Sequence, residues 1–82
     1  MDRAEVAERV KRVTAQVLGV KPEAISESSR FVEDLGAESI QSLELVAAFE
    51  EEFQIEMEED AALSVKNVGD AITFIHRIVA GG

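Results

Sequence analysis

The sequence predicts an all-α protein with three substantial helices and one short one. Apolar residues recur at three- and four-residue spacing in three separate segments, which is the period of an amphipathic helix. No alternating strand pattern and no hairpin dipeptide appears in the chain. The chain has 82 residues, of which 46% are hydrophobic, enough for one modest core. We therefore expect residues 1–82 to form a single domain.

The first helix is expected to end at a glycine. Its apolar stripe consists of Val6, Val10, Val13 and Val17. Gly19 follows the stripe, and glycine readily takes the left-handed conformation that ends many helices. Pro22 comes shortly afterwards and cannot continue the helix.

A long loop is expected between the first and second helices. Residues 19–37 are rich in glycine, proline and serine, which favour turns. Loops of this length inside a compact domain are uncommon and usually functional. Five apolar residues of this loop are expected to be buried against the helices: Val20, Ile25, Phe31, Val32 and Leu35.

The second helix is predicted from Ser39 to Phe53 and has two apolar sides. At about 100° per residue, one side collects Leu45, Val46, Phe49 and Phe53. The other side collects Ile40, Leu43 and Ala47, with Glu44 and Glu51 on one edge and Glu50 on the other. Since a helix in a small domain buries one broad face, we expect the aromatic side to face the core. An exposed apolar stripe between carboxylates would remain.

The remaining chain predicts a short third helix and a longer fourth helix. One or two turns are expected around Glu59 to Ser64, because this acidic segment is too short for more. Val68, Ala71, Ile72, Ile75 and Ile78 recur at helical spacing in the fourth helix. Asn67 precedes them as a candidate N-cap.

The composition excludes several classes of function. The net charge is −9, from 17 acidic and 8 basic residues, which argues against a nucleic-acid partner and favours basic protein partners. Without cysteine, the chain has no disulfide and no thiolate metal site. The N-terminal "MDRAEVAERV" lacks the apolar core of a signal peptide, and no apolar run approaches the ~20 residues of a membrane span. We therefore expect a cytoplasmic protein that does not insert into membranes.

Ser39 stands at the predicted start of the second helix, and the local pattern allows a purely structural role as its N-cap. A hydrolytic nucleophile fits poorly, because no Gly-x-Ser-x-Gly turn surrounds it and His76 is the one histidine of the chain. We therefore assign no catalytic residue. The acidic run "EEEFQIEMEED" lacks EF-hand spacing, so we expect no specific metal site, although weak divalent-ion binding stays open.

The segment "FVEDLGAESIQSLELVAAFEEEF" resembles the part of acyl carrier proteins that surrounds the phosphopantetheine-bearing serine. Two more segments are similar to this family: "ERVKRVTAQVLGVKPEAI" to its first helix and "SVKNVGDAITFI" to its last loop and helix. The resemblance covers nearly the whole chain without a gap. It implies a four-helix bundle with a short third helix and a long loop between helices one and two.

The resemblance also implies a function. In this family, a phosphopantetheinyl transferase moves 4′-phosphopantetheine from coenzyme A to the serine that matches Ser39. Acyl groups then travel as thioesters on the arm, between enzymes that load, elongate and transfer them. The protein would thus be a monomeric carrier in fatty acid, specialised lipid or polyketide biosynthesis, and not an enzyme. A tethered substrate is presented at a raised effective concentration.

Two further sets of residues are assigned by resemblance. The surface that would dock on basic patches of partner enzymes consists of Glu38, Ile40, Leu43, Glu44, Ala47, Glu50 and Glu51. The lining of the acyl-chain pocket would include Phe31, Phe49, Ala62, Val65, Ala71 and Ile75.

Departures from the family pattern leave the pathway and the partners open. Glu38 and Ile40 replace the usual aspartate and leucine beside the serine, Glu58 replaces a common proline, and Phe49 is bulkier than the usual leucine.

Two alternative functions of other classes stay open. One is an unmodified acidic interaction module with a carrier fold, and the other is an acidic ion-binding domain.

Overall fold

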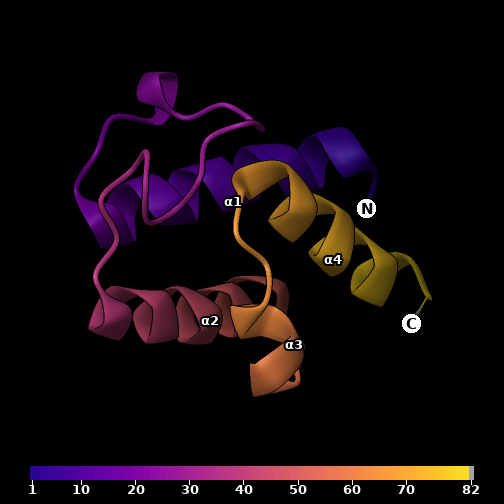
Figure 1. Cartoon of the computed structure of the whole chain (residues 1–82). Coiled ribbons are helices and arrows are strands. Elements are labelled where there is room, and N and C mark those ends of the chain that lie inside the picture. The colour runs from indigo at the N-terminus through magenta and orange to yellow at the C-terminus, as the bar shows by residue number, and fades with distance from the viewer. Residues whose placement is uncertain (82) are drawn as a thin grey trace.

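The structure is a computed structural model of the chain and describes residues 1–81 (Figure 1). The elements are α1 (Arg3–Leu18), a 3-10 turn η1 (Pro22–Ala24), α2 (Ser39–Phe53), α3 (Glu59–Leu63) and α4 (Val68–Gly81). Residues 1–81 contain no β-strand, and a single isolated bridge pairs Arg30 with Asn67. The predicted all-α fold, with its short third helix and long first loop, is confirmed.

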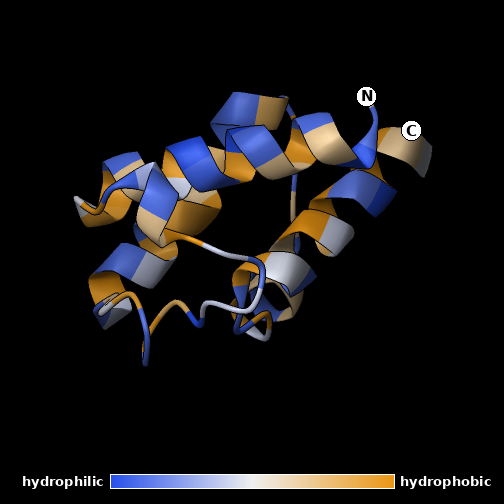
Figure 2. Cartoon of the chain, turned by 90° about the horizontal axis from the view of Figure 1, so that it is seen from above, coloured by the Kyte–Doolittle hydropathy of each residue, from blue (hydrophilic) through white to orange (hydrophobic). Residues whose placement is uncertain are grey.

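The other two long helices, α2 and α4, both pack against α1. Helix α2 runs beneath α1 in the opposite direction, α4 lies beside α1, and α3 packs against α2 (Figure 1). Each long helix mixes hydrophilic and hydrophobic residues along its length, as expected for elements that bury one side (Figure 2). Within residues 1–81, no helix combines the length and the apolar character needed to cross a bilayer.

The core is built from the predicted apolar faces together with parts of the loop. Its buried members on the helices include Val6, Val10, Val13, Leu45, Phe49, Phe53, Val68, Ala71, Ile72 and Ile75. The aromatic side of α2 therefore faces inward, as predicted, with Val46 partly buried at its margin.

The long loop follows the prediction except at Val32. Ile25 and Phe31 are buried, and Val20 and Leu35 are partly buried. Val32 is 53% exposed, so its predicted burial is wrong. The reason is local: residues 31–35 form turns, in which neighbouring side chains project to different sides, and Phe31 takes the inward direction.

The helix ends depend on specific capping groups. Gly19 ends α1 with φ of 69°, and the Asn67 side chain accepts a 2.8 Å hydrogen bond from the Asp70 amide at the start of α4, as predicted. Asp2, which the sequence analysis did not identify, caps α1 by accepting from the Glu5 amide at 2.9 Å.

Backbone hydrogen bonds attach the long loop to the start of α4. The amides of Phe31, Val68 and Gly69 donate to the carbonyls of Lys66, Ser29 and Glu27, at 3.0, 2.9 and 2.8 Å. A Cβ at Gly69 would lie 2.9 Å from the Glu27 carbonyl oxygen, so only glycine permits this close approach.

An ion pair reinforces this junction at the surface. Arg3 donates to both carboxylate oxygens of Glu27, at 2.9 and 3.1 Å. The hydrogen bond and the charge of Arg3 hold the pKa of Glu27 below its ordinary value. The loop is therefore held between α1 and α4, although pairs this exposed stabilise a fold only weakly.

Candidate functional site

Ser39 is the first residue of α2 and is exposed. Glu38 precedes it in an extended conformation and is the N-cap, and the Gln41 side chain accepts a 2.9 Å hydrogen bond from the Glu38 amide. Helix α2 begins at Ser39 as predicted, but the interpretation of Ser39 as its N-cap is wrong, because Glu38 occupies the cap position and Ser39 is already helical. Its hydroxyl has no capping role and faces solvent.

The start of α2 offers hydrogen-bond donors to an anion. The first intrahelical bond of α2 runs from the Ser42 amide to the Glu38 carbonyl, at 3.0 Å. The amides of Ser39, Ile40 and Gln41 precede it and have no helical carbonyl to bind. The Gln41 amide faces the Glu38 side chain in a capping box, which leaves those of Ser39 and Ile40 free. Free amides and the helix dipole together favour a phosphate group at this position. Ser42 lies one turn further, is half-buried, and its hydroxyl donates weakly to the Glu38 carbonyl, at 3.4 Å.

The turn before α2 holds Ser39 in place. Gly36 has φ of 73°, a left-handed conformation that favours glycine. The following Ala37 is 5% exposed and its amide donates to the Phe31 carbonyl at 2.9 Å. Arg30 and Asp34 close the turn from outside: the side chain and the amide of Arg30 both donate to the Asp34 carboxylate, which lowers the pKa of Asp34.

The second side of α2 is exposed, as the sequence predicts. Ile40 is 62% exposed, Leu43 is 44% exposed, and Ala47, Glu44 and Glu51 are exposed as well. We call these five residues the acidic stripe. It begins next to Ser39, so a protein that binds it would also reach the serine.

Glu50 differs from the other carboxylates assigned to docking. It is half-buried, and its side chain accepts a 2.8 Å hydrogen bond from the Met57 amide. This bond ties the segment after α2 back to the helix. Glu50 therefore has a structural role that the helical pattern did not reveal, since Met57 lies beyond the end of α2.

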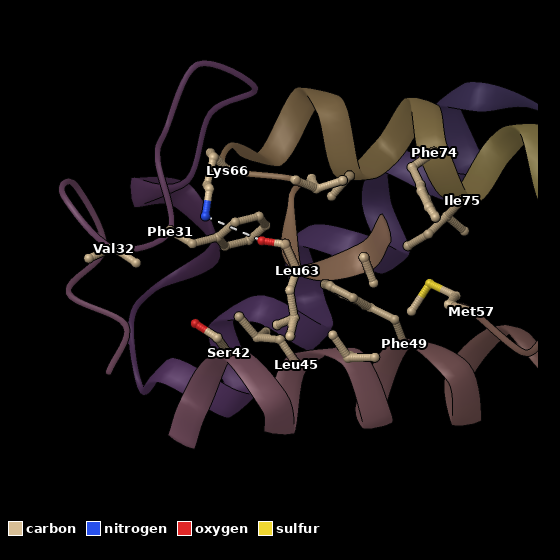
Figure 3. A pocket seen from close by; sticks show the side chains of 14 residues that line it. Phe31, Val32, Ser42, Leu45, Phe49, Met57, Leu63, Lys66, Phe74 and Ile75 are labelled. Carbon is tan, nitrogen blue, oxygen red and sulfur yellow. Dashed lines mark hydrogen bonds between the residues drawn. The ribbon is translucent and has the colours of Figure 1, made fainter. Parts of the chain in front are cut away.

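All six residues assigned to the pocket line one cavity of about 80 Å³ (Figure 3). These residues are Phe31, Phe49, Ala62, Val65, Ala71 and Ile75. The structure adds eight that the sequence analysis missed: Val32, Ser42, Leu45, Val46, Met57, Leu63, Lys66 and Phe74. The walls come from α2, α3, α4 and the loops, and the lining is mostly apolar.

The cavity is small in this conformation. A dry apolar cavity of ~150 Å³ is known to accept benzene, and about 80 Å³ is roughly half of that. Phe49 is 5% exposed and contributes a large ring to the wall. A short aliphatic segment fits such a space, whereas a long chain requires side chains or helices to move.

Two other kinds of site were considered from the sequence, a hydrolytic serine acting with His76 and a metal site in the acidic run. Ser39 begins α2 at one side of the molecule, whereas α4, which carries His76, runs toward the opposite side (Figure 1). Within residues 1–81, no cluster of three or more aspartate, glutamate or histidine side chains is arranged to hold a metal ion.

Comparisons with known proteins identify the family. The model of the "Phosphopantetheine attachment site" family matches residues 8–75. The chain is 49% identical over 77 residues to the "Acyl carrier protein" of Sinorhizobium fredii (strain NBRC 101917 / NGR234), an alignment that spans 94% of this chain and 99% of the relative. The chain belongs to the acyl carrier protein family. The "Acyl carrier protein AcpP" of Rhizobium meliloti (strain 1021) matches with the same identity and coverage.

As an acyl carrier protein, the chain is a carrier and not a catalyst, and its cofactor is 4′-phosphopantetheine. When bound, this group supplies a terminal thiol on a flexible arm. The start of α2 fits its phosphodiester, because an exposed serine hydroxyl and the free amides of Ser39 and Ile40 meet there. Members of the acyl carrier protein family work with biosynthetic enzymes, and the acidic stripe beside Ser39 is a surface available to them.

Proposed function

We propose that this chain carries acyl groups as thioesters on a 4′-phosphopantetheine arm attached to Ser39, in fatty acid biosynthesis or a related lipid or polyketide pathway. The observation that supports this most is the placement of Ser39. It is exposed, it is the first residue of α2, and its own amide and that of Ile40 are free at the helix start. The names of the two rhizobial relatives support the acyl cargo.

The attachment step uses the hydroxyl of Ser39. A transferase would remove its proton and join Oγ to the phosphorus of coenzyme A that bears the pantetheine. The bond from this phosphorus to the rest of the coenzyme breaks, and the serine proton leaves to a base on the transferase. The free amides at the start of α2 then stabilise the negative charge of the phosphodiester.

The partner enzymes are proposed to dock on the acidic stripe through basic patches. Its glutamates attract a basic surface, and its apolar residues supply buried contact area after encounter. Glu38 belongs to this surface, because it is exposed directly before Ser39. Glu50 contributes less, since its carboxylate is engaged with Met57. We expect the carrier to act as a monomer in the cytoplasm.

The cavity behind α2 is proposed to shelter the acyl chain. Its apolar lining matches an aliphatic chain, and it lies between α2 and α4 within reach of the loops (Figure 3). The volume of about 80 Å³ limits the chain that fits without rearrangement to a short one.

The proposal is tested by converting the purified protein with coenzyme A and a phosphopantetheinyl transferase. We expect the intact mass to increase by one phosphopantetheine in the wild type and in Ser42→Ala, and the modified peptide to contain Ser39. Ser39→Ala is expected to gain no mass, while circular dichroism shows an unchanged helix content. Modification of Ser39→Ala would contradict the assignment. An unmodified wild type would favour the alternative of an acidic interaction module.

A further inference from the structure

The cavity has one polar end, which faces the start of α2. Of the labelled residues in Figure 3, Ser42 and Lys66 lie toward the same end as Val32, whereas Phe74, Ile75 and Met57 lie at the other. Ser42 is in the first turn of α2, three residues after Ser39. The end of the cavity nearest the first turn of α2 therefore carries one hydroxyl and one ammonium group, and we call this end the mouth.

The backbone holds Lys66 firmly at this position. Its carbonyl accepts a 3.0 Å hydrogen bond from the amide of Phe31, which is itself buried in the cavity wall. The neighbouring Asn67 pairs with Arg30 in the isolated bridge. The second bond of this bridge runs from the Val68 amide to the Ser29 carbonyl, so the Lys66 carbonyl lies in a short paired segment that fixes where its side chain begins.

The amine of Lys66 has little to bind within the protein. It donates a long 3.3 Å hydrogen bond to the Leu63 carbonyl. The ion pairs found among residues 1–81 involve Arg3, Arg9, Arg12 and Arg30, and none involves Lys66. The hydroxyl of Ser42 likewise makes only a 3.4 Å bond to Glu38. The ammonium group of Lys66 therefore keeps N–H donors to spare, whereas the single O–H of Ser42 can donate to a chain only by giving up its long bond to Glu38.

We infer that Lys66 and Ser42 make this carrier selective for acyl chains that bear an oxygen on C3, as 3-hydroxyacyl chains do. The inference rests on the proposed function. A chain tethered at Ser39 enters the cavity tail first, so its apolar end meets the aromatic and aliphatic lining. The atoms next to the thioester remain at the mouth, beside the ammonium and hydroxyl groups.

The selectivity follows from the cost of burying a polar atom. An oxygen on C3 loses water when the chain enters, and that loss is unfavourable unless a protein donor replaces the water. Lys66 and Ser42 provide this replacement. A saturated chain has no such oxygen and gains nothing from the two donors. The thioester carbonyl is common to both chains, so its contacts do not contribute to the difference between them.

The test compares the protection of two thioesters. The holo protein is loaded with hexanoyl or with 3-hydroxyhexanoyl groups, short chains suited to a small cavity, and cleavage by hydroxylamine is followed by mass. Each rate is divided by that of the matching pantetheine thioester, which removes the intrinsic reactivity of the chain. We expect the wild type to protect the 3-hydroxy chain about two- to tenfold better, as one added hydrogen bond would give.

Variants of Lys66 and Ser42 test whether these two residues cause the better protection of the 3-hydroxy chain. Lys66→Met, which keeps the apolar stem, is expected to bring the ratio of normalised rates close to one, and Ser42→Ala to reduce it partly. Lys21→Met is the matched control, because Lys21 is exposed next to η1 and does not line the cavity. The control should keep the wild-type ratio.

Two results would overturn the inference. One is equal protection of both chains by the wild type, and the other is a preference that survives in Lys66→Met. In the second case, a changed ³¹P shift of unacylated Lys66→Met would show that the amine binds the phosphodiester instead. A failure of the proposed function itself would be recognised earlier, because the protein would gain no phosphopantetheine and accept no acyl group.

Discussion

Thr14 is the least satisfied polar residue in the core. It is fully buried in α1, and its hydroxyl is the one buried side-chain oxygen or nitrogen among the described residues without a hydrogen-bond partner. Burial of an unpaired hydroxyl costs about 1–3 kcal/mol. Valine has nearly the same shape and no polar atom. We expect Thr14→Val to raise the free energy of unfolding by about 1 kcal/mol, measured by urea denaturation.

Thr73 provides the control for this substitution. Its hydroxyl accepts from Arg3 at 3.4 Å, and the residue is only partly buried, so Thr73→Val should bring no gain. An unchanged or lower stability of Thr14→Val would mean that the hydroxyl finds a partner, such as a backbone carbonyl of its own helix.

The residue roles that were predictable from sequence depend on near neighbours. Gly19 and Asn67 act within one turn of their own helix, so spacing and residue type were sufficient to assign them. Val32 is exposed because Phe31 takes the inward direction in the same turn. Glu50 accepts a hydrogen bond because the chain after α2 folds back and brings the Met57 amide to it. Periodicity carries no information about such contacts. The N-cap role of Glu38 was missed because glutamate is a rare N-cap.

At the scale of elements, α2 combines three functions on separate parts of its surface. Its start carries the candidate attachment serine, its exposed side carries the acidic stripe, and its buried side forms one wall of the cavity. The helical pattern predicted both sides, since two apolar groups of residues separate at 100° per residue. The helical pattern could not predict the volume of the cavity, because this volume depends on how α3 and α4 pack against α2.

Charge reversal on the acidic stripe is expected to slow docking. Glu44→Lys or Glu51→Lys should lower the association rate with a phosphopantetheinyl transferase by about two- to tenfold at low salt, because exposed charges act mainly on encounter. Stopped-flow or surface-binding kinetics would measure this rate. Glu23→Lys, an equally exposed charge in η1, serves as the control. Equal association rates for all three variants would leave the stripe with a solubilising role only.

The size of Phe49 is expected to limit the chain that the cavity accepts. Phe49→Leu removes ring volume from a wall that leaves about 80 Å³, at some cost in packing. A bound long-chain thioester, such as a hexadecanoyl group, should then resist hydroxylamine better in Phe49→Leu than in the wild type. Faster or equal cleavage in Phe49→Leu would show that another part of the cavity sets the limit.

At the scale of the whole molecule, the distribution of charge is uneven. Two arginines of α1 bind the end of α2. Nitrogens of the Arg12 and Arg9 guanidinium groups lie 2.7 and 3.6 Å from a carboxylate oxygen of Glu52. The guanidinium carbon of Arg9 also lies 5.8 Å from the centroid of the Phe53 ring. Residues 50–60 contain seven carboxylates and no lysine or arginine. Repulsion is therefore concentrated at the end of α2 and in the segment leading into α3.

This repulsion predicts that salt stabilises the fold. The molecule measures 32 × 25 × 19 Å, so at 0.01 M salt, where the Debye length is ~30 Å, nearly all its charges interact. At 0.1 M the length falls to ~10 Å and the net charge of −9 is largely screened. If screening recovers about 1 kcal/mol, the melting temperature should rise by about 4–8 °C over this range of sodium chloride.

The double variant Glu58→Gln/Glu59→Gln, which alters two exposed carboxylates of the crowded segment, should melt higher at 0.01 M and respond less to salt. A melting temperature independent of salt in both proteins would show that attraction by the arginine pairs already offsets the repulsion.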